Sequence, residues 1–502
     1  MSLGLVGCRG DVESMGLRRE CTEASFRNPH ISQKTPLSVV ILLADGTRPD
    51  TLDAAVRSGA LPALARLRDE GGMHTITSCF PSVTGPAYAP FLMGRFPGPI
   101  GLPGLRWFDR AREVCTFPDY TRSYVGYQMR SVDRDIAADA PTIFELCDGS
   151  IGALNVIGRG LPVSDRIGSI TALSALRAAR THFAGNVAGW LQIDRDVATQ
   201  VTRRIRDDKP EFVFAALTGV DKVSHARGHE APMIMDALRI VDDAAAQIRT
   251  DAERAGRWEA MSLWVVSDHG HSRVTMHEDL AGIVAAQGHR TVSHPWVFTP
   301  SPDVAVMVSG NAMAHLYVDV RSRRGPGDAL GPRWTSLLDM LLARPSVDVA
   351  LVPGVSDVAI HAGGRGRATA RLDGDRYSYR REGGDPLGIG RDLDGVSADE
   401  AYDATIDTDY PDGVVQIVHL ARSSRSGEII LSAARDWDFR ARYEPIPHVS
   451  SHGALHREHM LVPLLVNRPI QGRPRRTVDV MPSALAALGK TVPLGLDGES
   501  FV

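Results

Sequence analysis

Residues 39–50 read VVILLADGTRPD, an apolar run that ends in an Asp-Gly turn. Consecutive β-branched and leucine residues of this kind predict a short strand that is buried on both faces of a parallel sheet. Asp45 then lies just beyond the carboxyl end of that strand. Because open α/β sheets bind ligands in the crevice outside the carboxyl ends of their strands, Asp45 is a candidate site residue.

Two more apolar runs repeat this arrangement, and each is followed by an Asp and a His. They are residues 212–217 with Asp221 and His225, and residues 262–266 with Asp268 and His269. Apolar runs also alternate with helical stretches such as residues 232–254, which favours an α/β sandwich with a mostly parallel sheet. We therefore expect three strands to bring carboxylates and imidazoles to one edge of the sheet.

A hydroxyl side chain suited to nucleophilic attack lies in the segment CFPSVTGPAY, residues 79–88. Coordination to a metal would make the Thr84 hydroxyl an alkoxide near neutral pH, much as bound zinc lowers the pKa of water. Gly85 and Pro86 favour a sharp turn into a helix, with Pro at its first position. Ser82 is the competing nucleophile, and the alternative role of Thr84 is that of a helix N-cap.

The ligand types favour zinc over calcium and magnesium, which prefer oxygen alone, because imidazole together with carboxylate suits first-row divalent ions. We expect two divalent ions, with zinc as the first choice and manganese as the alternative.

In content and order, these elements resemble the alkaline phosphatase superfamily, and within it the type I phosphodiesterase/nucleotide pyrophosphatase branch. The resemblance runs from about residue 37 to residue 502. It rests on Asp-Gly-x-Arg-Pro-Asp after the first strand, Pro-Ser-x-Thr, Asp-x-x-x-His, Ser-Asp-His-Gly and a late His-Gly at His452. It implies an alkaline-phosphatase-like sandwich, with a mostly parallel central sheet flanked by helices and a smaller α+β lobe.

The resemblance also implies two metal ions, each held by distant parts of the chain. One ion is expected at Asp221, His225 and His452, and the other at Asp45, Thr84, Asp268 and His269. The neighbouring histidines 448, 456 and 459 compete with His452, which we prefer because Ser-His-Gly matches the family's turn. His271, His277 and His294 are expected at the entrance, on the surface or behind the ligands.

Substrate contacts are expected outside the metal ligands. Nucleotide pyrophosphatases usually offer an amide side chain soon after the nucleophile, where this chain has Ala87 and Tyr88. Residues 97–134 are rich in Gly, Pro, Arg and aromatic residues, which predicts a loop that covers the substrate. We expect Arg106 to bind a phosphate oxygen, Trp107 to stack on a planar leaving group and Tyr88 to supply a further contact.

These motifs predict a zinc-dependent hydrolase of phosphoric esters, and a phosphodiesterase first, in which Thr84 attacks phosphorus and forms a phosphothreonine intermediate. The alternatives are a phosphomonoesterase or a phosphonate hydrolase with a phosphonoacetate-like substrate. A binding module without turnover ranks lower because every expected position is filled. An isomerase resembling the cofactor-independent phosphoglycerate mutases ranks lower because it would prefer a serine nucleophile.

Composition agrees with a small-molecule enzyme. The net charge of −4 carries no nucleic-acid signature, and no apolar stretch is long enough to span a bilayer. The five cysteines include no Cys-x-x-Cys pair, which suggests free thiols in a reducing compartment. We therefore expect a cytoplasmic protein with a phosphate ester or phosphonate as substrate and with neither nucleic acid nor membrane as partner.

The chain divides into four expected segments. Residues 1–36 are a poorly ordered N-terminal extension without the apolar core of a signal peptide. Residues 37–303 form the first part of the catalytic core, residues 304–437 the smaller α+β lobe, and residues 438–502 the rest of the core.

Overall fold

The computed structural model describes residues 37–110, 121–124, 127–168, 180–181, 183–294, 299–321, 327–440 and 448–502. The predicted N-terminal extension, residues 1–36, lies outside them. The described residues pack together as one unit, and no helix among them is long and apolar enough to cross a bilayer.

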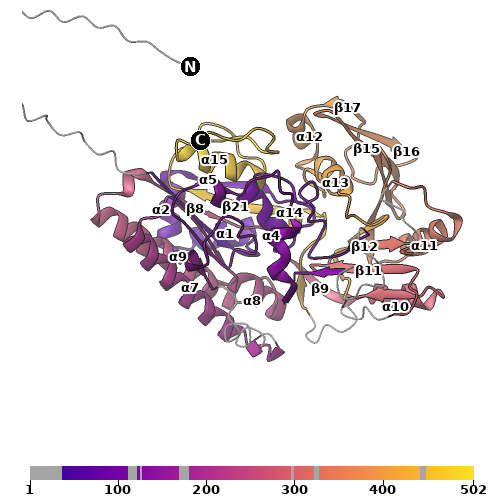
Figure 1. Ribbon diagram of the computed structural model, residues 1–502, viewed down its shortest axis with the longest axis horizontal. Helices are drawn as coiled ribbons and strands as arrows, with labels where there is room; N and C mark the ends of the chain where they lie inside the picture. Colours follow the sequence, from indigo (N-terminus) through magenta and orange to yellow (C-terminus); the bar gives the residue numbers. More distant parts are fainter. Residues whose placement is uncertain are drawn as a thin grey trace, which may run out of the picture. The chain divides into compact units, whose positions relative to one another are not determined.

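A central sheet of seven strands carries the N-terminal half of the fold (Figure 1). Its order is β2 (Gly72–Thr77), β21 (Leu461–Val466), β8 (Met261–Val266), β1 (Ser38–Ala44), β7 (Phe212–Leu217), β5 (Ser150–Ala153) and β6 (Arg166–Ile167). β1 pairs in parallel with β7 and β8, and β5 pairs in parallel with β6 and β7. β21 runs antiparallel to β2 and β8. The predicted mostly parallel sheet is therefore confirmed.

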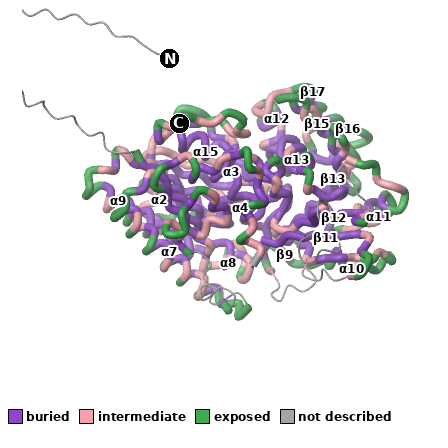
Figure 2. The backbone as a smooth tube through the Cα atoms, in the orientation of Figure 1, coloured by how far each residue is buried: buried purple, intermediate pink, exposed green. Residues whose placement is uncertain are grey.

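Helices cover both faces of this sheet because successive side chains of β1 point to opposite sides. Val40 and Leu42 pack in one core with α1 (Pro49–Arg57), α2 (Pro62–Glu70), α7 (Val187–Asp208) and α9 (Met233–Arg254). Ile41 and Leu43 pack in the other core with α3 (Ala89–Met93) and α15 (Val480–Ala487). Figure 2 shows the buried backbone concentrated between these layers.

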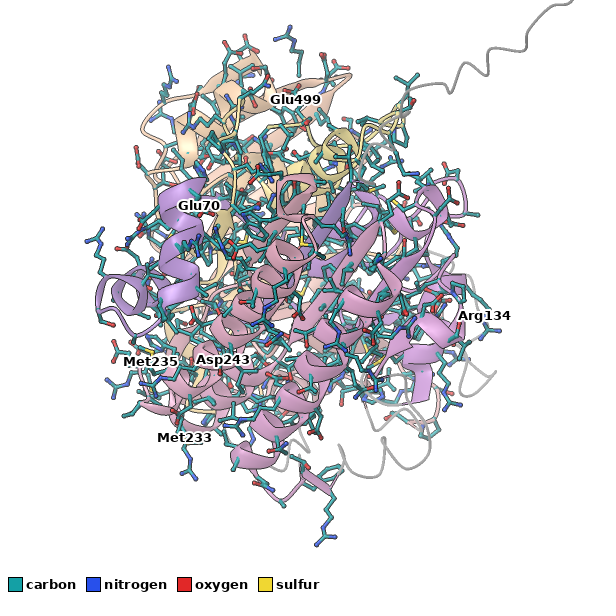
Figure 3. The ribbon with its side chains drawn as sticks, turned by 90° about the vertical axis from the view of Figure 1, so that its left-hand side faces the viewer. Glu70, Arg134, Met233, Met235, Asp243 and Glu499 are labelled. Carbon is teal, nitrogen blue, oxygen red and sulfur yellow. The ribbon has the colours of Figure 1, made fainter. Side chains whose placement is uncertain are left out.

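An ion pair joins α2 to α9, and Figure 3 labels its carboxylate partner, Glu70. Glu70, at the end of α2, accepts two hydrogen bonds of 2.7 Å from Arg249 on α9. The same guanidinium lies 4.4 Å from the ring centroid of Trp258. The helix expected over residues 232–254 is confirmed as α9, with Ile234 and Leu238 on its buried face.

A second sheet of nine strands forms the smaller α+β part. In order, its strands are β10 (Thr291–Ser293), β11 (Val304–Ser309), β12 (Met313–Val318), β18 (Ile429–Ala433), β13 (Val347–Pro353), β14 (Asp357–Ala362), β15 (Gly366–Asp373), β16 (Arg376–Glu382) and β17 (Leu393–Val396). Its helices include α10 (Leu280–Ala286), α11 (Pro332–Leu342), α12 (Ala398–Thr405) and α13 (Gly413–Ala421). These strands span residues 291–433 and overlap the predicted lobe, whose boundaries at 304 and 437 stay a prediction.

A small three-stranded sheet ties the C-terminal segment to the end of β8. β9 (Ser272–His277) lies between β19 (Asp436–Asp438) and β20 (Ser450–Ser451). The antiparallel pairing of β9 with β20 places Ser272 opposite Ser451. The residues that flank this pair, His271 and His452, are consequently brought side by side.

Candidate metal centre

Three neighbouring strands deliver carboxylates to one edge of the seven-stranded sheet. Asp45 follows β1, Asp268 follows β8, and Asp221 lies in the first turn of α8 (Gly219–Arg227), just after β7. The Asp221 amide donates a 3.0 Å hydrogen bond to the Asp45 carbonyl, which fixes the two turns against each other. All three aspartates are at most 1% exposed. The expected convergence at this edge is confirmed.

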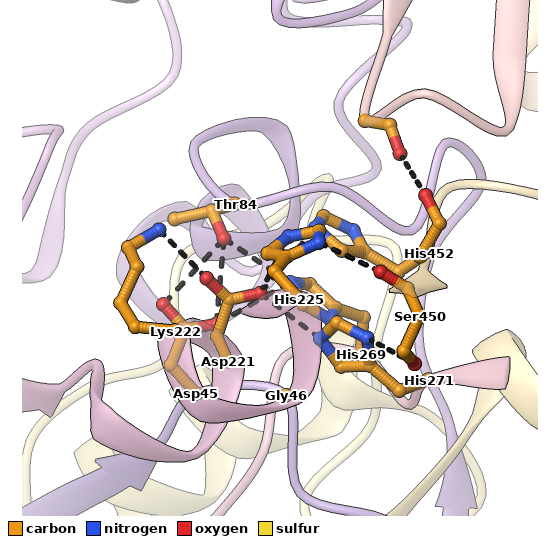
Figure 4. A network of polar contacts seen from close by, with 12 residues as sticks. Asp45, Gly46, Thr84, Asp221, Lys222, His225, His269, His271, Ser450 and His452 are labelled. Atoms are coloured by element: carbon orange, nitrogen blue, oxygen red, sulfur yellow. Dashed lines mark hydrogen bonds and ion pairs between the residues drawn. The ribbon is translucent and has the colours of Figure 1, made fainter. Parts of the chain in front are cut away.

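The first group of donor atoms, which we call the Thr84 cluster, consists of Asp45, Thr84, Asp268 and His269 (Figure 4). Thr84 Oγ1 lies 3.1 Å from His269 Nε2 and 3.4 Å from Asp45 Oδ1. His269 Nε2 lies 3.3 Å from Asp45 Oδ1 and 3.5 Å from Asp268 Oδ2. Thr84 is partly exposed, whereas the other three residues are buried. Thr84 is therefore the most exposed residue of the four.

The Thr84 cluster fits a divalent cation. The Asp268 Oδ2 atom is buried and has no hydrogen-bond partner, which is uncommon for a buried polar atom in a folded protein. His269 Nδ1 lies 3.1 Å from the Gly270 carbonyl, to which it donates, so the lone pair of Nε2 faces the aspartates. Tetrahedral zinc with oxygen and nitrogen ligands has ligand-to-ligand separations of about 3.3–3.6 Å, close to those observed.

The second group, which we call the histidine cluster, consists of Asp221, His225, His271 and His452, whose donor atoms lie within 4.8 Å of one another. Asp221 Oδ1 lies 3.1 Å from Nε2 of His225, 3.0 Å from Nε2 of His271 and 3.5 Å from Nε2 of His452. The Nδ1 atoms of these histidines, on the side of each ring away from Asp221, face oxygen atoms. His225 Nδ1 donates to the Ser450 carbonyl and His452 Nδ1 to the Ser82 carbonyl, each at 2.9 Å. Figure 4 shows the rings converging on the carboxylate.

Burial sets the charge states at both clusters. Burial and repulsion from Asp268 and Asp221 raise the pKa of Asp45 well above its ordinary value. Burial alone would also raise the pKa of Asp221, but Lys222, whose Nζ lies 2.7 Å from Oδ2, and His225 lower it well below the ordinary value. Burial lowers the pKa of His452 strongly and that of His271 to about 3. Neutral imidazole is the form that binds metals.

His271 is the one member of the histidine cluster that the sequence interpretation placed elsewhere, at the entrance, on the surface or behind the ligands. The structure buries it completely beside Asp221. The sequence carries no local signal for this position, which depends on the space left at Gly46 of the Asp-Gly turn. The φ of Gly46, +78°, is a conformation that favours glycine, and a Cβ atom there would lie 2.9 Å from the His271 ring.

The other histidines near the end of the chain form hydrogen bonds with residues outside the histidine cluster. His456 Nδ1 lies 2.8 Å from Glu458, and His459 accepts a 3.0 Å hydrogen bond from the Ala454 amide. His448 Nδ1 lies 2.7 Å from the Asn311 side chain, with its ring 4.1 Å from that of His225. Of the four competing histidines, His452 is the one whose nitrogen reaches Asp221.

The predicted substrate contacts do not gather at the centre. Trp107 is completely buried, edge-on to Tyr124 at 4.9 Å, so its ring has no free face for a leaving group. This corrects the expectation for Trp107, because the pairing of residues 106–108 with residues 121–123 packs its ring into the core. Tyr88 is also buried and lies 3.4 Å from Asp45 through its hydroxyl. It therefore supports a ligand rather than facing the substrate.

Arg106 lies outside both clusters. Its guanidinium donates to the Val308 carbonyl at 3.5 Å, and the residue lines a small pocket with His294 and Arg440. The described part of the predicted cover, residues 97–134, includes the hairpin of β3 (Arg106–Phe108) and β4 (Thr121–Ser123), which packs into the core. Residues 111–120 and 125–126 of that segment lie outside the described ranges.

Comparisons with known proteins agree with this architecture. The model of the type I phosphodiesterase/nucleotide pyrophosphatase family matches residues 39–329, more than half of the chain. No curated protein matches the chain. A solved structure of the phosphonoacetate hydrolase from Sinorhizobium meliloti 1021 with phosphonoacetate is similar at 15% identity and a TM-score of 0.55, over 90% of this chain and 96% of that one.

Two ectonucleotide pyrophosphatase/phosphodiesterase 5 structures are also similar. The murine protein, as an inactive threonine-to-alanine variant in complex with AMP, has 14% identity and a TM-score of 0.52 over 91% of this chain and 96% of that one. The human protein has 13% identity and a TM-score of 0.54 over 92% and 97%. These likenesses confirm the alkaline-phosphatase-like fold.

Proposed function

Because the chain belongs to the type I phosphodiesterase/nucleotide pyrophosphatase family and is a phosphoric ester hydrolase, we propose that Thr84 is its nucleophile and that two divalent ions assist it. One observation carries the proposal: Thr84 is a partly exposed residue whose Oγ1 atom lies 3.1–3.5 Å from His269 and Asp45. The inactivity of a threonine-to-alanine variant of the murine structural neighbour supports this role.

Asp45, Asp268 and His269 would hold one ion together with Thr84, and Asp221, His225 and His452 would hold the other. When bound, the ions would lower the pKa of the Thr84 hydroxyl and offset the negative charge of the phosphoryl group. Zinc is the proposed metal. The Thr84 cluster, which has three oxygen donors, is also suited to manganese.

The reaction that we propose has two displacements at phosphorus. Thr84 Oγ1 forms a bond to phosphorus while the bond to the leaving oxygen breaks, and the proton of the Thr84 hydroxyl passes to the leaving oxygen, which gives a phosphothreonine and an alcohol. Water then attacks phosphorus, and Thr84 Oγ1 leaves and regains a proton. Burial of Asp45, Asp268 and His269 behind Thr84 keeps bulk water from the rear of the hydroxyl. Tyr88 supports Asp45 from below through its 3.4 Å contact.

A phosphodiester is the first substrate class that we propose. The test compares kcat/KM for bis(p-nitrophenyl) phosphate, p-nitrophenyl phosphate and phosphonoacetate, with zinc and with manganese. The expected result is that the diester is preferred over the monoester. A large preference for the monoester would reject the diesterase assignment while leaving the role of Thr84 intact.

A phosphonate that also carries a carboxylate is the second candidate, and the similarity of the fold to that of a phosphonoacetate hydrolase in complex with phosphonoacetate supports it. We propose Arg106 as the residue that binds the carboxylate, because guanidinium groups bind carboxylates well. For such a substrate, Arg106→Ala should raise KM for phosphonoacetate more than KM for the aryl diester, with metal content unchanged.

A further inference from the structure

The Nε2 atom of His271 lies as close to Asp221 Oδ1 as do the Nε2 atoms of His225 and His452, the two histidines already assigned to this ion. We infer that His271 is a fourth protein ligand of the ion at this cluster, so that three imidazoles and one carboxylate enclose the ion. This inference rests on the proposed two-metal function and adds to it a ligand at a position where the sequence indicated only a peripheral role.

The hydrogen bonds of Ser450 fix the tautomer of His271. The Ser450 hydroxyl donates to the Ser272 carbonyl at 2.7 Å, so its proton is already used. In the 3.2 Å contact between Ser450 Oγ and His271 Nδ1, the nitrogen must therefore be the donor. A neutral imidazole has one N–H group, so its lone pair is on Nε2 and points at Asp221 Oδ1, 3.0 Å away.

A cation beside Asp221 Oδ1 would stabilise this approach of an imidazole nitrogen to a carboxylate oxygen at 3.0 Å. The same holds for His225 and His452, whose Nδ1 atoms donate to carbonyl oxygens and whose Nε2 lone pairs point at Asp221. The alternative, in which His271 Nε2 donates a hydrogen bond to Asp221, would need the Ser450 proton for Nδ1. That would break the shorter of the two Ser450 hydrogen bonds.

The ring geometry agrees with convergence on one point. The His271 ring lies 4.9 Å from that of His225 and 5.1 Å from that of His452, at interplanar angles of 80° and 66°. The Nε2 separations from Asp221 Oδ1, 3.0–3.5 Å, are close to the edge of about 3.3 Å for a zinc tetrahedron. Rings that merely stacked in a core would not direct three nitrogens at one oxygen.

Two independent features of the fold keep His271 in this position. The pairing of Ser272 with Ser451 sets it beside His452, and the absence of a side chain at Gly46 makes room for its ring. Four protein ligands characterise closed zinc sites, whereas catalytic sites keep a position open. The histidine cluster therefore holds its zinc tightly and has no open position. Oxygen atoms of water or substrate bind at the Thr84 cluster instead.

The test is zinc affinity, measured by competition with a chromophoric chelator on the full chain, for wild type, His271→Ala and His271→Gln. Loss of a ligand should weaken one of two zinc sites by about 100-fold or more in both variants, beyond the effect of most outer-shell changes. Glutamine can donate to Asp221 but is a poor zinc ligand. An affinity of His271→Gln within about tenfold of wild type would overturn the inference, since a positioning role tolerates a substitute donor.

His315→Gln is the matched control because His315 is equally buried and bonds the Pro103 carbonyl at 2.9 Å, outside both clusters. It should leave both zinc affinities unchanged. A crystal structure of zinc-loaded wild-type protein needs no variant. Anomalous density about 2.0–2.1 Å from His271 Nε2 supports the inference, and water in that place overturns it.

These readouts are separate from the proposed function. Wild-type protein that binds two zinc ions, one of them through His271, but hydrolyses no ester would reject the function and keep the ligand. Wild-type protein that hydrolyses esters while His271→Gln binds zinc normally would reject the ligand and keep the function.

Discussion

The Thr84 cluster and the histidine cluster lie side by side but differ in donor chemistry. The Thr84 cluster offers two carboxylates, a hydroxyl and one imidazole, and its hydroxyl is partly exposed. The histidine cluster offers one carboxylate and three imidazoles, whose outer nitrogens are held by backbone or serine oxygens. The difference suggests distinct roles for the two halves of the proposed two-metal centre: the Thr84 cluster would present the reactive group, and the histidine cluster would anchor an ion.

The two clusters also differ in how the chain builds them. Asp45, Asp268 and His269 follow directly on two neighbouring strands, so the sheet alone places them. The histidine cluster draws His271 and His452 from the two sides of the β9–β20 pairing, outside the main sheet. The comparison therefore predicts that damage to one cluster leaves the other loaded.

Removing the nucleophile should have the largest effect on activity. Thr84→Ala should lower kcat by a factor of about 10⁴ or more, because no other hydroxyl takes its place. Zinc at the histidine cluster should remain. Thr84→Ser keeps a hydroxyl and should retain measurable turnover, and Ser82→Ala is the control for the competing serine. If Ser82→Ala alone abolishes turnover, the nucleophile is Ser82, whose hydroxyl donates to the Ala454 carbonyl at 3.0 Å.

Removing a carboxylate from the Thr84 cluster should lead to the loss of one of the two bound ions. Asp268→Asn replaces the unpartnered oxygen with a neutral amide, so metal content should fall from about two ions to about one per chain. Elemental analysis after gel filtration measures this. The reciprocal variant, His225→Ala, should empty the histidine cluster instead. Loss of both ions in Asp268→Asn would mean that the clusters do not bind independently.

Metal exchange should distinguish the clusters more finely. Brief treatment with a chelator should remove the ion of the oxygen-rich Thr84 cluster first, and manganese should restore turnover while one zinc is retained. The retained metal is identified by mass spectrometry of the native protein. Restored activity with two manganese ions and no zinc would contradict the difference in donor chemistry.

The smallest effect is expected at Tyr88. Tyr88→Phe removes a buried hydroxyl that lies 3.4 Å from Asp45, so the unfolding free energy should fall by about 1 kcal/mol. Because Tyr88 supports a ligand and does not face the substrate, kcat should fall by less than about tenfold, and KM should be unchanged. A rise in KM without a change in kcat would return Tyr88 to the role of a substrate contact.

Much of the fold follows from local pattern. Residues 39–43, 212–217 and 262–266 form strands, as expected, because each is a short apolar run that ends in a turn. Pro86 begins a helical turn after Gly85, whose φ is +101°, as the Thr-Gly-Pro sequence indicates. Trp107 shows the limit of this reasoning: its Arg-rich surroundings favoured a surface loop, but the hairpin turns the ring into the core.

By itself, the sequence determined which chemistry the strand ends carry: Asp45, Asp268 and His269 stand next to apolar runs, and neighbours in the chain set both the strand and its turn. Only the tertiary structure decided the histidine cluster. His271 meets Ser450 across 179 residues of chain, and Tyr88 meets Asp45 across 43. Such contacts depend on strand pairing and on the space left at Gly46, and no local pattern records which distant residue will fill that space.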